Sequence, residues 1–112
     1  MSHPRMSKVA NNGAWSIDDA RSLYNIDRWG VGYFDINARG CVEVHPLQEK
    51  GASVEIKAVI AEVQKRGLRY PMLLRFQDIV RHRVAAINGA FWESINRHNY
   101  RARYRGVFPV KV

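Results

Sequence analysis

An apolar stripe between Asp78 and about His98 is the feature that most constrains the fold. Apolar side chains recur there at spacings of four, three, four and four residues, which places them on one face of a helix: Val80, Val84, Ile87, Phe91 and Ile95. Gly89 lies within this stretch and costs roughly 1 kcal/mol relative to alanine unless another element packs closely there. A long helix with one apolar face requires other elements that cover this face.

Apolar segments flank this helix on both sides, and both are predicted to be strands. "YPMLLRF" (Tyr70 to Phe76) precedes it, with Pro71 near its start, where a missing N–H is tolerated. The closing stretch, Tyr104 to Val112, follows it. Strand, helix and strand in this order have the length of a β-α-β unit, in which the two strands are normally parallel.

Two shorter helices are predicted before this unit. Ser16 with Asp19 three residues later indicates an N-cap for a helix of about two turns in "SIDDARSLY". A second helix is predicted in "SVEIKAVIAEVQKRG", with Ser53 as its cap, Glu55 in its first turn and Gly67 closing it.

A β-hairpin is predicted between these helices. Its strands run from Trp29 to Ile36 and from Cys41 to His45, around the turn "NARG". Because a single hairpin is only marginally stable in water, its apolar face needs a cover that this stretch does not supply. The elements together predict the α/β class.

The composition is that of one small globular chain. Its 112 residues are 46% hydrophobic and 11% aromatic, and a net charge of +8 makes a polyanionic partner worth considering. Cys41 is the single cysteine, which excludes an internal disulfide framework and suits a reducing, cytoplasmic compartment. Residues 1–14 read as a polar, disordered leader, and no apolar run is long enough to cross a bilayer.

Motifs for metals and phosphates are weak or absent in the sequence. Cys41 with His45, and His82 with His98, are the nearest metal-ligand pairs, and neither has the multi-ligand spacing of a zinc site. We therefore expect no metal site. The sequence has no glycine-rich phosphate loop, and "GVG" is too short to be a dinucleotide fingerprint.

The run "RHNYRARYRG" interleaves basic and aromatic side chains, which can pair with phosphates and stack on bases. Its candidate contacts are Arg97, His98, Tyr100, Arg101, Arg103, Tyr104 and Arg105. Basic residues also collect at a helix C-terminus, where they oppose the helix dipole. A freestanding basic nucleic-acid-binding module is therefore the alternative function class, and a solvated connector is the structural interpretation.

Lys111 stands out because it follows the apolar residues Val107, Phe108 and Val110. A lysine among such residues must either extend to solvent or find an anionic partner. In a desolvated pocket a lysine can act as a nucleophile toward carbonyl groups. Local sequence alone also fits an exposed lysine at a chain end, so both interpretations stay open.

From Trp15 onward the sequence resembles the N-terminal segment of the biosynthetic arginine decarboxylases. The matching stretches, in the order of that family, are "YNIDRWGVGYFDINARGCVEVHP", "LLRFQDIVRHRVAAINGAF", "YRGVF" and "FPVKV". Together they cover well over half of the chain.

The resemblance implies a pyridoxal 5'-phosphate enzyme that converts L-arginine to agmatine and CO2 in polyamine biosynthesis. Magnesium is a further cofactor associated with the family. Lys111 matches the lysine that holds the cofactor covalently, at the end of the first strand of an alanine-racemase-like barrel. Phe108 stands where the family often has tyrosine. A homo-oligomer is the implied assembly.

The resemblance also implies how the chain is divided. Residues 15–69 would be an N-terminal segment of short helix, hairpin and helix, whose hairpin joins a separate β-domain. Residues 70–112 would be the incomplete start of the barrel, a strand-helix-strand that leads into it and ends with Lys111 on the first barrel strand. Because a (β/α)8 barrel needs about 250 residues, we expect an incomplete, truncated fragment that is inactive alone. Such a chain should be extended, with apolar faces exposed.

Overall fold

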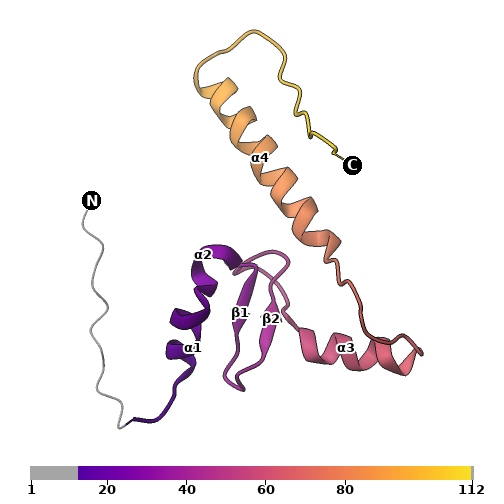
Figure 1. Cartoon of the computed structure of the whole chain (residues 1–112). Coiled ribbons are helices and arrows are strands. Elements are labelled where there is room, and N and C mark those ends of the chain that lie inside the picture. Colours follow the sequence, from indigo (N-terminus) through magenta and orange to yellow (C-terminus); the bar gives the residue numbers. More distant parts are fainter. Residues whose placement is uncertain (1–12, 112) are drawn as a thin grey trace.

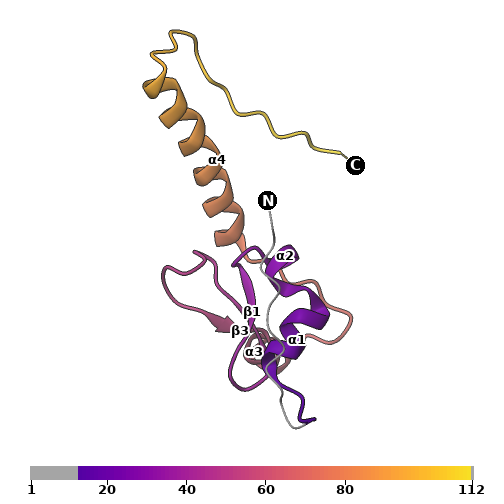
Figure 2. The same ribbon diagram turned by 90° about the vertical axis from the view of Figure 1, so that its left-hand side faces the viewer.

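The computed structural model describes residues 13–111 as an α/β arrangement of helices and short strands. In chain order the elements are α1 (Ile17–Tyr24), α2 (Ile26–Gly30), β1 (Phe34–Ile36), β2 (Val42–Val44), β3 (Val54–Glu55), α3 (Ile56–Lys65) and α4 (Gln77–Arg97) (Figure 1). Elements α1 to α3 cluster as an N-terminal unit, and α4 projects from it (Figure 2). Of the leader expected over residues 1–14, only Gly13 and Ala14 fall within the described residues.

The N-terminal unit is built on a three-stranded antiparallel sheet of order β1-β2-β3. Helices α1 and α2 pack against β1, while α3 packs against β2 and β3. The core is small and consists of Ile26, Tyr33, Ile36 and Val44, each at most 5% exposed. This core holds the sheet to α2, and the rest of the chain contributes no buried hydrophobic side chain within the described residues.

The predicted first helix and the hairpin turn are confirmed. Ser16 Oγ accepts a hydrogen bond from the Asp19 N–H at 3.1 Å, and Asp19 Oδ2 accepts one from the Ser16 N–H at 2.9 Å, which completes a capping box. In the turn, Asn37 Oδ1 accepts from the amides of Arg39 and Cys41, each at 3.0 Å. These local hydrogen bonds explain why the sequence pattern alone was sufficient here.

The first hairpin strand is shorter than predicted, because Trp29 and Gly30 belong to helix α2. Trp29 Nε1 donates to the carbonyl of Tyr24 at 2.9 Å. The chain then reverses through Val31 and Gly32, whose φ angles are +47° and +75°, so the strand begins only at Phe34. A β-branched valine in left-handed backbone is unusual, and the pattern could not reveal it.

The second helix begins at Ile56, and the prediction that Ser53 caps it is wrong. Val54 and Glu55 instead form β3 and pair with Val44 and Glu43 of β2. Because their backbone groups are used in the sheet, the helix begins at Ile56, two residues later than a cap at Ser53 would give. Gly67 closes it as predicted, with φ at +85°.

The long helix is confirmed as α4, but the two strands predicted around it are not formed. Residues 70–76 and 104–111 form neither helix nor strand, and the described part of the chain has no parallel pair of strands around α4. A strand exists only where a neighbour accepts its backbone hydrogen bonds, and neither segment has one among residues 13–111. Residue 112, the end of the second predicted strand, lies outside the described residues.

The chain is extended, as expected. Its Cα radius of gyration is 19.3 Å, against about 13 Å for a compact domain of this size. The apolar stripe of α4 stays open, with Val80 at 62%, Ile87 at 48% and Phe91 at 50% exposure. No helix in residues 13–111 combines the length and apolar character that crossing a bilayer requires.

Candidate functional site

Lys111 lies on the segment that follows α4 and turns back from its C-terminal end (Figure 1). The lysine is exposed, and so are its apolar neighbours Val107, Phe108 and Val110, each more than 80% accessible. These residues, predicted as a strand, are therefore neither buried nor paired in the described part of the chain. Lys111 thus lies at the end of an exposed, partly apolar segment, residues 104–111, which we call the ribbon.

Tyr104 attaches this ribbon to the helix. Its ring stacks on that of Phe91 with centroids 4.5 Å apart and planes 13° from parallel, and it meets the edge of Trp92 at 6.1 Å. Its hydroxyl donates to Asn88 Oδ1 at 2.9 Å. The helix thus presents three side chains to one tyrosine, at spacings of three and four residues along one face.

A surface hollow of about 340 Å³ lies where the ribbon leaves the helix. Its walls include Val84 and Ile87 from α4, and Gly106, Val107 and Phe108 from the ribbon. Lys111 does not line this hollow. The site that the sequence predicted around the lysine therefore consists here of one exposed amine and the segment that carries it.

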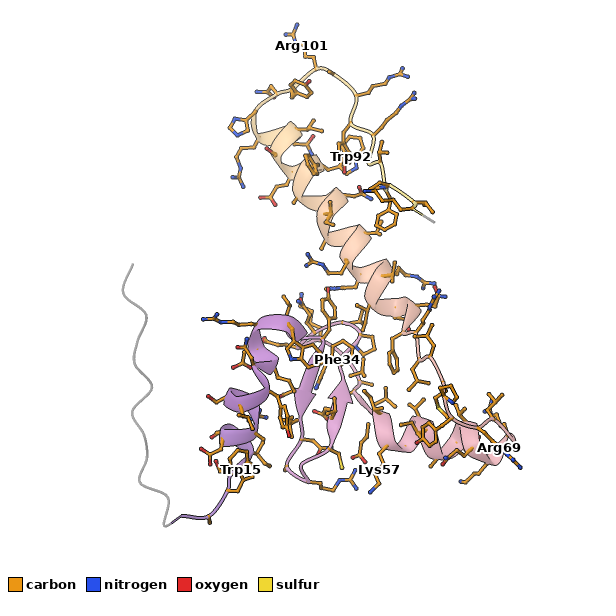
Figure 3. The ribbon with its side chains drawn as sticks, viewed as in Figure 1. Trp15, Phe34, Lys57, Arg69, Trp92 and Arg101 are labelled. Atoms are coloured by element: carbon orange, nitrogen blue, oxygen red, sulfur yellow. The ribbon has the colours of Figure 1, made fainter. Side chains whose placement is uncertain are left out.

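The basic run is divided by the structure. Arg97 Nη2 pairs with Glu93 Oε1 at 2.5 Å within α4, and the Tyr104 ring is stacked on Phe91. Arg101 stands at the outer end of the loop after α4 and points away from the molecule, while Trp92 lies on the helix side that faces the returning chain (Figure 3). The run therefore forms no continuous row of free aromatic and basic contacts.

One pair joins α4 to the N-terminal unit. The Tyr33 hydroxyl and His82 Nδ1 are 2.6 Å apart, and their rings meet edge to face at 5.6 Å. His82 is thus used in packing and not paired with His98 as a metal ligand. His45 Nε2 lies 2.8 Å from Glu43 Oε1, and residues 13–111 contain no group of three His, Cys, Asp or Glu side chains able to hold a metal ion.

The sheet carries a row of carboxylates, because Asp35 pairs in register with Glu43, and Glu43 with Glu55. Like charges directly opposite each other are destabilising. Each carboxylate has its own hydrogen-bond partner. Arg21 contacts Asp35 through two hydrogen bonds, of 2.7 and 3.0 Å, while Glu43 contacts His45.

Glu55, the third member of the row, accepts a hydrogen bond from Asn37 Nδ2 at 2.9 Å and pairs with Arg39. The Asn37 hydrogen bond is the main cause that lowers the pKa of Glu55. Partial burial raises the pKa of Asp35, but hydrogen bonds from Arg21 and the Ile36 amide outweigh it and leave this pKa below its ordinary value. Asp35 and Glu55 are therefore held in the ionised form by contacts within the sheet and its turn, and these contacts do not involve Lys111.

The long-range contacts of Tyr104 and Tyr33 escaped prediction from sequence. Tyr104 was placed among candidate nucleic-acid contacts, and the one available signal was its position in "YRGVF", a stretch that carries the family resemblance. Tyr33 gave no local signal, because its partner lies 49 residues away.

Comparison with known proteins gives a consistent family. The chain is 43% identical over 104 residues to a biosynthetic arginine decarboxylase of Parasynechococcus marenigrum, which covers 93% of this chain and 16% of the relative. It is 44% identical over 98 residues to the enzyme of that name from Gloeobacter violaceus, which covers 88% and 15%. The enzyme of that name from Geotalea daltonii is 40% identical over 98 residues, with the same coverage.

No family model matches the chain, and no solved structure matches it. The chain spans about 16% of the length of the curated relatives. The matches nevertheless reach 39 to 44% identity over 92 and 88% of the chain, which is enough to assign the family. The chain belongs to the biosynthetic arginine decarboxylases, as a segment of an enzyme of that family.

Proposed function

We propose that this chain contributes to the decarboxylation of L-arginine to agmatine and CO2, with Lys111 as the residue that holds pyridoxal 5'-phosphate. The observation that carries the proposal is the 43% identity over 93% of the chain to a protein named for that activity. The position of Lys111 in "FPVKV" supports its role by resemblance to the family. Cytoplasmic location, homo-oligomeric assembly and an association with magnesium belong to the same proposal.

Lys111 fits one requirement of this cofactor. It offers an exposed primary amine at the end of an extended apolar segment, and Nζ would form the covalent link. When bound, the cofactor supplies an electron sink for the bond electrons released as CO2 leaves. Lys111 would anchor the cofactor and release it to the amine of the substrate. The described residues offer no glycine-rich loop for the phosphate, so other parts of the enzyme would bind it.

The open faces support a place in a larger fold. Val107, Phe108 and Val110 are more than 80% exposed, and the stripe of α4 is about half exposed. We propose that residues 70–112 begin a (β/α)8 barrel, with α4 leading into its first strand and Lys111 at the C-terminal end of that strand. The helix and hairpin within residues 15–69 would join a separate β-domain.

We expect no decarboxylase activity from the isolated chain, because the groups that bind the phosphate, the ring nitrogen and the guanidinium in this family are expected outside residues 13–111. The purified 112-residue chain would be incubated with pyridoxal phosphate and L-arginine, and agmatine would be measured. We expect the same background from the chain and from its Lys111→Ala variant. Turnover above that variant would contradict the expectation.

A segment exchange tests the function itself. The matching segment of the Parasynechococcus marenigrum enzyme would be replaced by this chain, and agmatine formation would be assayed. We expect an active hybrid that loses activity with Lys111→Ala and keeps it with Lys57→Ala, a matched change at an exposed lysine of α3 (Figure 3). A soluble hybrid that stays fully active with Lys111→Ala would refute the proposed role.

A further inference from the structure

The segment that carries Lys111 is held to α4 at one place. After α4 the chain reverses through Asn99, whose φ is +50°, and the Tyr100 amide donates to the carbonyl of Ile95 at 3.0 Å. The ribbon then meets the helix again at Tyr104. Beyond Gly106 its apolar side chains are almost fully exposed. The Tyr104 contacts are therefore the last anchoring point before the lysine.

Two kinds of contact act together at Tyr104. The near-parallel stack on Phe91 and the edge contact with Trp92 fix the plane of the ring. The hydrogen bond of 2.9 Å to Asn88 Oδ1 fixes the direction in which the Tyr104 side chain points along α4, because the hydroxyl at the tip of the ring is its one donor. Stack and hydrogen bond together allow one register of the ribbon along α4.

Gly106 makes this register possible for a steric reason. A Cβ at this position would come within 3.0 Å of both Asn88 Oδ1 and Tyr104 Oη, the two atoms of the hydrogen bond. Such a contact is tighter than nine in ten real Cβ contacts, so Asn88 or Tyr104 would have to move by a few tenths of an ångström. The close approach of the backbone to this hydrogen bond favours a glycine at position 106.

We propose that Tyr104 and Asn88 are positioning residues for Lys111. Their hydrogen bond docks the ribbon on α4 in one register and thereby sets where the lysine lies relative to the helix. This inference rests on the proposed function, since positioning matters only if Lys111 holds the cofactor. The docking itself is measurable without cofactor or activity.

The first experiment measures docking in the full 112-residue chain by NMR, from the ring-proton shifts of Tyr104 and the heteronuclear NOE of Gly106. Asn88→Leu should lower the ratio of docked to free ribbon about fivefold, the change that loss of one ordinary net hydrogen bond produces. Asn88→Asp, which keeps an acceptor, should restore docking. Tyr100→Phe, at an exposed tyrosine of the same loop, should change nothing.

The hydrogen bond is isolated by a double-mutant cycle. Tyr104→Phe keeps the stack and removes the donor, so it should match Asn88→Leu, and the double variant should be no worse than either change alone. Helix content by circular dichroism should be equal in all variants. Unchanged docking in Asn88→Leu, or fully additive effects in the double variant, would overturn the inference.

The second experiment uses the hybrid enzyme of the segment exchange. Asn88→Leu should lower kcat several-fold and leave the KM for arginine unchanged, and Asn88→Asp should restore kcat. If docking is lost but kcat is unchanged, the positioning role is wrong and the proposed function stands. If Lys111→Ala leaves the hybrid active, the proposed function fails, whatever the docking measurement gives.

Discussion

Replacing Arg21 with methionine should loosen α1 from the sheet. The guanidinium donates from Nε to Asp35 Oδ1 at 2.7 Å, from Nη2 to Asp35 Oδ2 at 3.0 Å, and from Nη2 to the Ile36 carbonyl at 2.8 Å. Methionine keeps most of the aliphatic stem and removes these three hydrogen bonds. The change also leaves Asp35 facing Glu43 in register without its cation.

The magnitude follows from the exposure of the pair. Exposed ion pairs contribute about 0.2–1 kcal/mol, and hydrogen bonds to charged groups contribute about 1.5–3 kcal/mol. The side chains of Arg21 and Asp35 are 33% and 39% exposed, so solvent screens the pair only in part. We therefore expect Arg21→Met to cost about 1–2 kcal/mol of free energy of unfolding of the N-terminal unit.

Amide hydrogen exchange measures this cost where it acts. The reporters are the amides of Asn37 and His45, which donate to the carbonyls of Cys41 and Tyr33 at 2.9 and 2.8 Å. Exchange converts directly to the free energy of opening this unit. The same reporters are read in wild type, Arg21→Met, Asp35→Asn and the double variant.

Asp18→Asn is the matched control for this prediction. Asp18 contacts the same guanidinium at 3.1 Å, but its side chain is 81% exposed, so we expect a cost of at most about 0.5 kcal/mol. Equal costs for Asp18→Asn and Asp35→Asn would refute the reasoning from burial. Additive effects of Arg21→Met and Asp35→Asn would show that the pair does not act as one unit.

Three further predictions concern the same chain. Folding lowers the pKa of Asp35, so the stability that its ionised carboxylate contributes should be complete above the unfolded pKa of about 3.9 and lost as pH falls through the folded pKa. The urea midpoint of unfolding should therefore fall over this pH range, and it should fall less in Asp35→Asn. Ser16→Ala should lower the stability of α1 by about 1 kcal/mol, and Ser16→Asn should not, as measured by amide exchange. His82→Leu should remove the link to Tyr33 and raise the radius of gyration in small-angle scattering, whereas His98→Leu should leave it unchanged.

Local patterns predicted the elements whose stabilising contacts are local. The Ser16 cap, the Asn37 turn and the length of α4 depend on hydrogen bonds within a few residues, so they were readable from sequence. The strands at Tyr70–Phe76 and Tyr104–Val112 failed for the opposite reason. Their apolar character is real, but a strand also needs a partner, and none lies beside them in residues 13–111.

The candidate site was predictable only in part. Lys111 was found through the resemblance of "FPVKV", because its local surroundings fit an exposed lysine equally well. The contacts of Tyr104 join residues 16 positions apart, and the pair of Tyr33 with His82 spans 49. Such contacts depend on how α4 and the loop after it fold in space, which residue patterns do not encode.

The most direct test of the central claim is to locate the cofactor on the hybrid enzyme. Borohydride reduction of the hybrid loaded with pyridoxal phosphate makes the covalent link permanent, and peptide mass spectrometry then identifies the modified lysine. We predict modification of Lys111 and none of Lys57. Modification of another lysine in an active hybrid, with Lys111 unmodified, would contradict the account.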